Sequence, residues 1–129
     1  MLKIAIIFIG AGTGGVLRHA VHTAVQRWAP SGFPLGTLVV NASGCLVAGV
    51  LAGALAGQAA MREEYRLLLF VGLLGGYTTF SAFGRETVEL MQRGAWGMAG
   101  LNVLLSNVLG IGGLWLGWII AGGRSSAGG

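Results

Sequence analysis

Polar residues interrupt the middle of one long apolar stretch, and this interruption limits what the chain can fold into. The stretch runs from about residue 67 to about residue 90, and a membrane-spanning helix needs about 20 residues. Residues Gly75 to Phe83 at its centre include two adjacent glycines, two threonines and a serine. Glycines and β-branched threonines are poor helix formers. The sequence therefore predicts a break in the helix between Gly75 and Ser81.

A helix break within a membrane needs protection from lipid. Unpaired backbone groups are costly in hydrocarbon, so a break persists only where protein or a water-filled cavity surrounds it. We therefore interpret the segment from Gly75 to Ser81 as the functional centre of the chain. The other apolar segments are expected to separate it from lipid.

The composition is that of an integral membrane protein. Of 129 residues, 54% are hydrophobic and 9% are charged, whereas soluble domains carry about 25% charged residues. The mean hydropathy is +0.77. The net charge of +4 does not indicate nucleic-acid binding, because the basic residues are scattered singly at the ends of apolar runs. The lone Cys45 excludes a disulfide within the chain.

The hydrophobic pattern predicts an all-α fold with four transmembrane helices, the third broken near its middle. The expected spans are about residues 4–25, 35–56, 66–91 and 96–121. They form a single transmembrane domain over residues 1–121, followed by a flexible Gly/Ser-rich tail over 122–129. Small residues repeat every four positions in the second span, which predicts a close helix contact along Gly49, Gly53 and Gly57.

The distribution of positive charge leaves the orientation in the membrane poorly determined. Four spans place both termini on one side, with four basic residues there and two in the opposite loops. This bias is weak by the positive-inside rule, so copies can insert either way up. The residues counted are Lys3, Arg62, Arg66 and Arg124 against Arg27 and Arg93.

The residue types argue against an enzyme. The chain has four acidic residues, no aspartate, no cluster of histidine with cysteine, and no nucleotide-binding loop. His19 and His22 lie three residues apart, so a metal site is geometrically possible. An interfacial pair near lipid headgroups is the preferred interpretation. Arg18 and Arg85 are costly in a membrane and are either functional or reach an interface by snorkelling.

Neutral hydrogen-bonding side chains gather near the middle of the spans. They can join helices, or they can line a polar path beside the break. N–H and hydroxyl donors can replace the hydration shell of a small anion. The set comprises Asn41, Ser43, Thr78, Thr79, Ser81, Ser106 and Asn107.

Two phenylalanines follow the break and can contribute to the same path. Phe80 and Phe83 share a helix face, and the edge of an aromatic ring is electropositive. Ring edges can therefore face an anion, although plain packing also explains such a pair. Carbonyl groups freed by the break suit a cation such as Na⁺ instead.

The sequence resembles the Fluc (CrcB) family of fluoride channels over nearly its whole length. Three segments carry the resemblance: Gly14 to Arg18, Gly36 to Gly44, and the long, specific Gly75 to Phe83 segment. The resemblance implies an antiparallel, dual-topology homodimer with two fluoride pores near the subunit interface. Such channels export cytoplasmic fluoride passively, and the expected location is the plasma membrane of a prokaryote, the inner membrane if the cell is Gram-negative.

The resemblance also implies roles for individual residues. Phe80 and Phe83 would line the pores, Asn41 would donate to fluoride, and Thr79 and Ser81 would add hydroxyls. Arg18 would attract anions in a vestibule. Backbone carbonyls of Gly75 and Thr78 from both chains would hold a structural Na⁺. Ser106 joins the predicted pathway by its mid-span position alone.

Two other functions compete with the channel. A small four-span multidrug or cation exporter needs a carboxylate within the membrane, and the first acidic residue inside a span is Glu86, toward a span end. A non-conducting assembly protein would explain the glycine pattern but not a broken helix with a polar centre. The channel is the preferred hypothesis.

Overall fold

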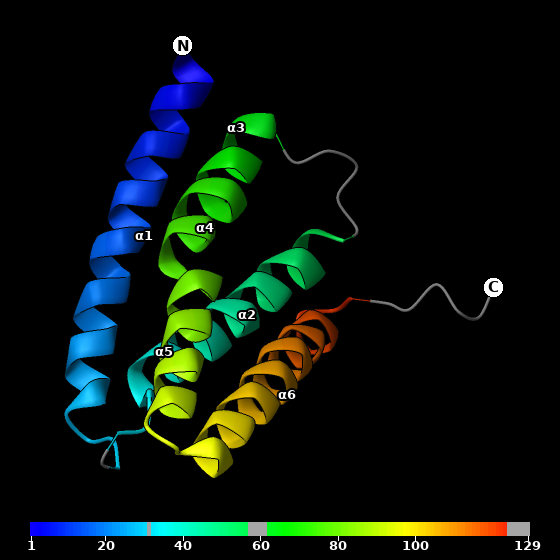
Figure 1. Cartoon of the computed structure of the whole chain (residues 1–129). Coiled ribbons are helices and arrows are strands. Elements are labelled where there is room, and N and C mark those ends of the chain that lie inside the picture. The colour runs from blue at the N-terminus through cyan, green and yellow to red at the C-terminus, as the bar shows by residue number, and fades with distance from the viewer. Residues whose placement is uncertain (31, 57–61, 124–129) are drawn as a thin grey trace.

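The described part of the chain is entirely helical. The computed structural model describes residues 1–30, 32–56 and 62–123, so Gly57 and the predicted tail from residue 124 onward lie outside it. The elements are α1 (Leu2–Gln26), α2 (Leu35–Leu55), α3 (Glu63–Arg66), the π-helix η1 (Leu67–Leu74), α4 (Gly75–Tyr77), α5 (Phe80–Gln92) and α6 (Trp96–Ile120) (Figure 1). No strand occurs within these residues.

Four helical segments are long and apolar enough to cross a membrane. They are Leu2–Gln26, Leu35–Leu55, Glu63–Gln92 and Trp96–Ile120. The prediction of four transmembrane helices in an all-α fold is confirmed. The third segment begins three residues before the predicted start, where Lys3 Nζ lies 2.8 Å from Glu63 Oε2.

The helices pack in two closely associated groups. α1 lies along η1 and α4, and α2 lies along α6 (Figure 1). Glycines allow the helices in each of these two groups to approach each other closely. A Cβ atom at Gly14 would overlap the backbone at Leu73, and one at Gly49 would overlap the backbone at Leu114. Gly53 likewise lies against Trp118, so two members of the predicted small-residue stripe make the expected close contact.

The break in the third segment is shorter than the sequence predicts. Gly75 to Tyr77 remain helical, and only Thr78 and Thr79 are extended, with φ/ψ of −81°/155° and −150°/112°. Gly76 serves packing rather than the break, because a Cβ there would overlap the backbone of Ala11 in α1. The helix before the break is also π-helical rather than α-helical over Leu67–Leu74.

Candidate functional site

A side chain from α2 replaces the helical hydrogen bonds that are lost at the break. The Thr79 N–H donates to Asn41 Oδ1 at 2.7 Å, and Asn41 Nδ2 donates to the Thr79 carbonyl at 2.9 Å. One amide thus satisfies both backbone groups of one extended residue. Since unpaired backbone groups are costly in a membrane, this pairing allows the break to exist there. Asn41 Nδ2 carries two N–H groups, and Thr79 engages one of them.

Hydroxyl groups complete the hydrogen bonding on either side of the break. Thr78 Oγ1 donates to the Leu74 carbonyl at 2.9 Å, at the end of the preceding helix. Thr79 is the N-cap of α5, where its Oγ1 accepts from the Ala82 N–H at 3.1 Å. Such a cap satisfies a donor that has no partner within its own helix. Ser81 Oγ lies 3.2 Å from Thr79 Oγ1, which places two hydroxyls together at the start of α5.

Five of the predicted pathway residues line one cavity beside the break. They come from α2, α5, α6 and the break itself, and the cavity has a volume of about 240 Å³. The five are Asn41, Thr79, Phe80, Phe83 and Ser106; we call this the phenylalanine cavity.

The aromatic pair and Ser106 have defined positions in the phenylalanine cavity. The ring centroids of Phe80 and Phe83 lie 5.5 Å apart with an interplanar angle of 46°. Phe80 is 83% exposed, so its ring projects away from the rest of the protomer. Ser106 Oγ donates to Asn102 Oδ1 at 3.4 Å, and the buried Asn102 in turn donates to Thr87 in α5 at 2.9 Å. Ser106 therefore belongs to the contact between α5 and α6.

A larger and more polar cavity lies between α1, α2 and α5. Its volume is about 500 Å³, and we call it the vestibule. Arg18 and Ser81 line it, and Thr79 lines both the vestibule and the phenylalanine cavity. The break thus adjoins both spaces. The remaining polar lining consists of His19, His22, Thr37, Arg85 and Glu86.

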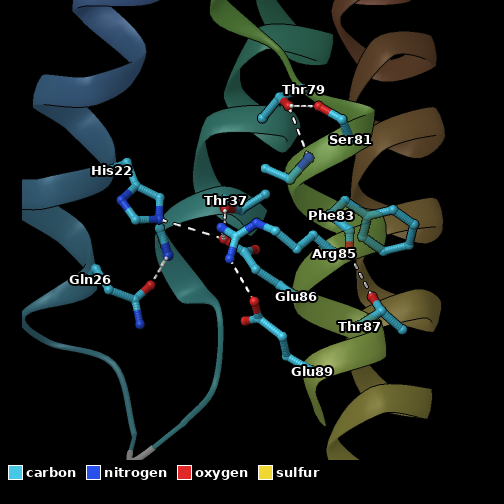
Figure 2. A network of polar contacts seen from close by, with 12 residues as sticks. His22, Gln26, Thr37, Thr79, Ser81, Phe83, Arg85, Glu86, Thr87 and Glu89 are labelled. Carbon is cyan, nitrogen blue, oxygen red and sulfur yellow. Dashed lines mark hydrogen bonds and ion pairs between the residues drawn. The ribbon is translucent and has the colours of Figure 1, made fainter. Parts of the chain in front are cut away.

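Charged groups meet within the vestibule around Glu86. Glu86 Oε1 accepts a hydrogen bond from Thr37 Oγ1 at 2.9 Å and lies 3.8 Å from Arg85 Nη2 and 3.9 Å from His22 Nε2. Figure 2 shows these side chains converging from three helices. Among the described residues, Glu86 Oε2 is buried without a hydrogen-bond partner. Arg85 also contacts Glu89 at 2.6 Å, one helical turn further along α5.

The proposed cation ligands lie next to the break and share a third cavity. Gly75 and Thr78 line a space of about 200 Å³, and Gly75 is exposed on the protomer surface. The neutral carbonyl oxygens of this segment are chemically suited to Na⁺. The Thr78 carbonyl also accepts from Arg18 Nη1 at 3.3 Å, and a carbonyl oxygen has a second lone pair. The oxygen type therefore suits a sodium ion, while the Arg18 guanidinium at the Thr78 carbonyl would repel a cation on that oxygen.

The sequence interpretation missed part of this arrangement. Thr37, His22 and Glu86 were not assigned to the pathway, yet the structure places them in the vestibule with Arg18. His19 and His22, expected near lipid headgroups, both line the vestibule. Ser43 also has a partner that was not foreseen, Tyr77 Oη at 2.9 Å.

Comparison with known proteins gives a consistent result. Residues 5–118 match the family described as CrcB-like protein, Camphor Resistance (CrcB). A protein of Methylobacterium nodulans named "Fluoride-specific ion channel FluC" is 46% identical over 88% of this chain and 91% of its own length. Proteins with the same name from Beijerinckia indica and Coxiella burnetii are 49% and 43% identical, over 87% and 92% of this chain and 90% and 97% of their own lengths.

Proposed function

This chain belongs to the CrcB family, and from that premise we propose that it is a fluoride-selective channel that exports cytoplasmic fluoride passively down its electrochemical gradient. The family resemblance drawn from the sequence is confirmed. The relatives are named as channels, so the chain is not an enzyme. It is a multi-pass membrane protein, and its bacterial relatives favour the plasma membrane of a prokaryote, the inner membrane in a Gram-negative cell.

One observation carries the proposal: the polar vestibule and the phenylalanine cavity both adjoin the helix break within a membrane-spanning bundle. Thr79 lines both of them, and this shared residue supports a route for the anion from the vestibule to the phenylalanine cavity. Arg18 attracts the anion electrostatically into the vestibule. The hydroxyls of Thr79 and Ser81 and the second N–H of Asn41 replace its hydration shell. The electropositive edges of Phe80 and Phe83 then face it without attracting cations.

The exposed groups beside the break support assembly of two copies. Phe80 is 83% exposed, and the phenylalanine cavity carries polar groups that would be costly against lipid. A second copy can cover this surface and close each path. The weak charge bias between the loops suits an antiparallel homodimer, and twofold symmetry then gives two pores for each dimer.

A structural sodium ion at the centre of the dimer is part of the proposal. The carbonyls of Gly75 and Thr78 from both copies would hold it. A bound ion would supply positive charge to these neutral oxygens, and the residues that hold it would then link the two copies. Its role is structural, and fluoride alone is the transported ion.

Replacing Gly75 with valine is expected to weaken the dimer and to remove its stabilisation by Na⁺. Among the described residues of one protomer, a Cβ at this position would meet the Phe70 carbonyl at 3.5 Å, which is an ordinary van der Waals contact, so the fold can accept a side chain there. A large loss of dimer in G75V would therefore arise from contacts with the second copy or with the ion between the copies. Dimer content would be measured by cross-linking in detergent with sodium or with N-methylglucamine. A Na⁺-stabilised dimer that persists in G75V would contradict the carbonyl assignment.

Fluoride efflux from liposomes that contain the purified protein tests the channel directly. We expect fast fluoride release, followed with a fluoride electrode, that requires valinomycin because fluoride carries charge out of the vesicle. Chloride release, measured in parallel, should remain at the level of protein-free liposomes. No fluoride release from well-folded protein would overturn the proposed function.

Replacing Phe80 with isoleucine is expected to lower the fluoride efflux rate by about tenfold or more, since an aliphatic side chain has no electropositive edge. Phe8→Ile is a matched control, because Phe8 is 78% exposed on α1 and lies outside both cavities. Its efflux rate should equal that of the wild type. Equal fluoride efflux rates in F80I and F8I would show that the Phe80 ring contributes to packing and not to the pathway.

One observation favours the exporter as a second candidate. Glu86 lies inside the vestibule, with its side chain 13% exposed, where a proton-coupled exporter would use a carboxylate. Arg18 and Arg85 line the same space and would repel an organic cation. Uptake of a lipophilic cation such as ethidium, driven by a pH gradient, would support the exporter, and its absence alongside fluoride efflux would exclude it.

A further inference from the structure

His22 and Glu86 stand at the boundary between the vestibule and a second, smaller cavity. The smaller cavity has a volume of about 170 Å³ and is also lined by Gln26, Gly32, Pro34, Glu89 and Arg93. These residues lie where the chain leaves α1, enters α2 and leaves α5, at one end of the helix bundle. Of the described residues, His22 and Glu86 alone line both cavities. The pair therefore lies between the smaller cavity and the vestibule.

The His22 ring is held in place by a close helix approach. A Cβ atom at Gly36 would lie 2.7 Å from His22 Cδ2, so the imidazole rests directly against the first turn of α2. The Gly36 N–H donates to Gln26 Oε1 at 2.8 Å, which ties this turn to the end of α1 (Figure 2). His22 Nε2 thereby faces Glu86 Oε1 at 3.9 Å, a distance at which a charged imidazole forms an ion pair.

When the His22 imidazole is neutral, the smaller cavity is lined by two carboxylates, of Glu86 and Glu89, and by one cation, Arg93. α5 contributes Glu86 and Glu89 against Arg85, which lies within 4.0 Å of both carboxylates. From α2 the facing side chain is the neutral Thr37. The remaining charged or titratable neighbours are Arg18 and His19 on α1 and Arg93 in the smaller cavity.

We propose that His22 and Glu86 form a proton-controlled entrance to the vestibule, through which fluoride passes faster when His22 is protonated. A histidine changes charge within the range of about pH 5 to 8. Its positive form pairs with Glu86 and removes the excess negative charge from the path of an incoming anion. The inference rests on the proposed function and adds regulation to the same pathway. Conduction then increases in acid, when hydrogen fluoride enters a cell and dissociates inside.

Fluoride current in planar bilayers tests this entrance, because neutral hydrogen fluoride carries no current. With symmetric fluoride and symmetric pH, the wild-type current should rise about three- to tenfold from about pH 8 to about pH 5.5. In His22→Gln the current should stay at the low level at both pH values. His22→Lys keeps the charge at both values, so its current should be high and independent of pH.

His19→Gln is the matched control, since His19 lines the vestibule but not the boundary cavity. The ratio of the currents at the two pH values should be the same in H19Q as in the wild type, even if the size of the current changes because His19 lines the vestibule. A wild-type current that does not change with pH would overturn the proton-controlled entrance while leaving the channel intact. The proton-controlled entrance would also be overturned if the increase of current in acid persisted in H22Q or disappeared in H19Q. An absence of fluoride current at both pH values in well-folded protein would overturn the proposed function, and this inference with it.

Discussion

Asn41→Asp should lower the fluoride efflux rate by at least about a hundredfold. The carboxylate has no N–H for the Thr79 carbonyl, and it faces the Thr79 N–H with a fixed negative charge in the phenylalanine cavity. Two like charges about 4 Å apart repel by about 4 kcal/mol at an effective dielectric constant of about 20, which exceeds a hundredfold effect on a rate. The reduction is measured by comparing fluoride efflux from liposomes that contain equal amounts of wild-type and N41D protein.

Asn107→Asp provides a matched control for Asn41→Asp. Asn107 lines the same cavity, but its Nδ2 donates to the Val103 carbonyl in its own helix and not to the break. The same charge is then introduced without disturbing Thr79, and we expect a loss of less than about tenfold because the hydrogen bonds at the break remain. Equal losses in both variants would show that cavity charge, and not the contact with Thr79, explains the N41D effect. Wild-type efflux in N41D would remove Asn41 from the pathway.

Gly49→Ala should reduce the free energy of unfolding by about 3 kcal/mol. The new methyl group overlaps the backbone of Leu114, so α2 and α6 must separate. Overpacking of this kind costs about 1–3 kcal/mol or more, because a backbone atom cannot rotate away as a side chain can. Alanine is a better helix former than glycine by about 1 kcal/mol, and this gain offsets part of the expected loss of stability. The difference in the free energy of unfolding between G49A and the wild type is measured by unfolding both proteins in mixed micelles with increasing fractions of SDS.

Gly12→Ala is the corresponding control for the helix-packing effect. Gly12 lies in the middle of α1, and a Cβ atom there has no neighbour within 4 Å among the described residues. The variant should be as stable as the wild type or slightly more stable. If G49A and G12A unfold at the same SDS fraction, the close contact between α2 and α6 does not limit stability.

The sequence predicts the four spans well because span length and hydropathy depend on local composition alone. It also identifies the residues around the break, since Asn41, Thr79, Phe80 and Phe83 belong to segments with recognisable patterns. The exact position of the break was less predictable. Glycine is suited both to irregular backbone and to close packing, and only the structure shows that Gly76 serves α1.

The vestibule could not be predicted because it depends on how three helices are rotated. Thr37, His22 and Glu86 come from α2, α1 and α5, and no sequence interval connects them. Each has an ordinary explanation when considered alone: a threonine in a helix, an interfacial histidine and an acidic residue near a span end. Their shared role follows only from distances below 4.0 Å in the folded chain.

The pairing of Asn41 with Thr79 has a consequence for the order of events during membrane insertion. Asn41 precedes Thr79 by 38 residues, so a chain that emerges from the ribosome delivers the amide to the membrane first. When the third span inserts, Asn41 is therefore already in the membrane. The Thr79 N–H and carbonyl can pair with it at once, so they are not left unpaired in lipid. We expect a circularly permuted chain that begins with the third span to insert poorly, although it would contain every contact of the native fold.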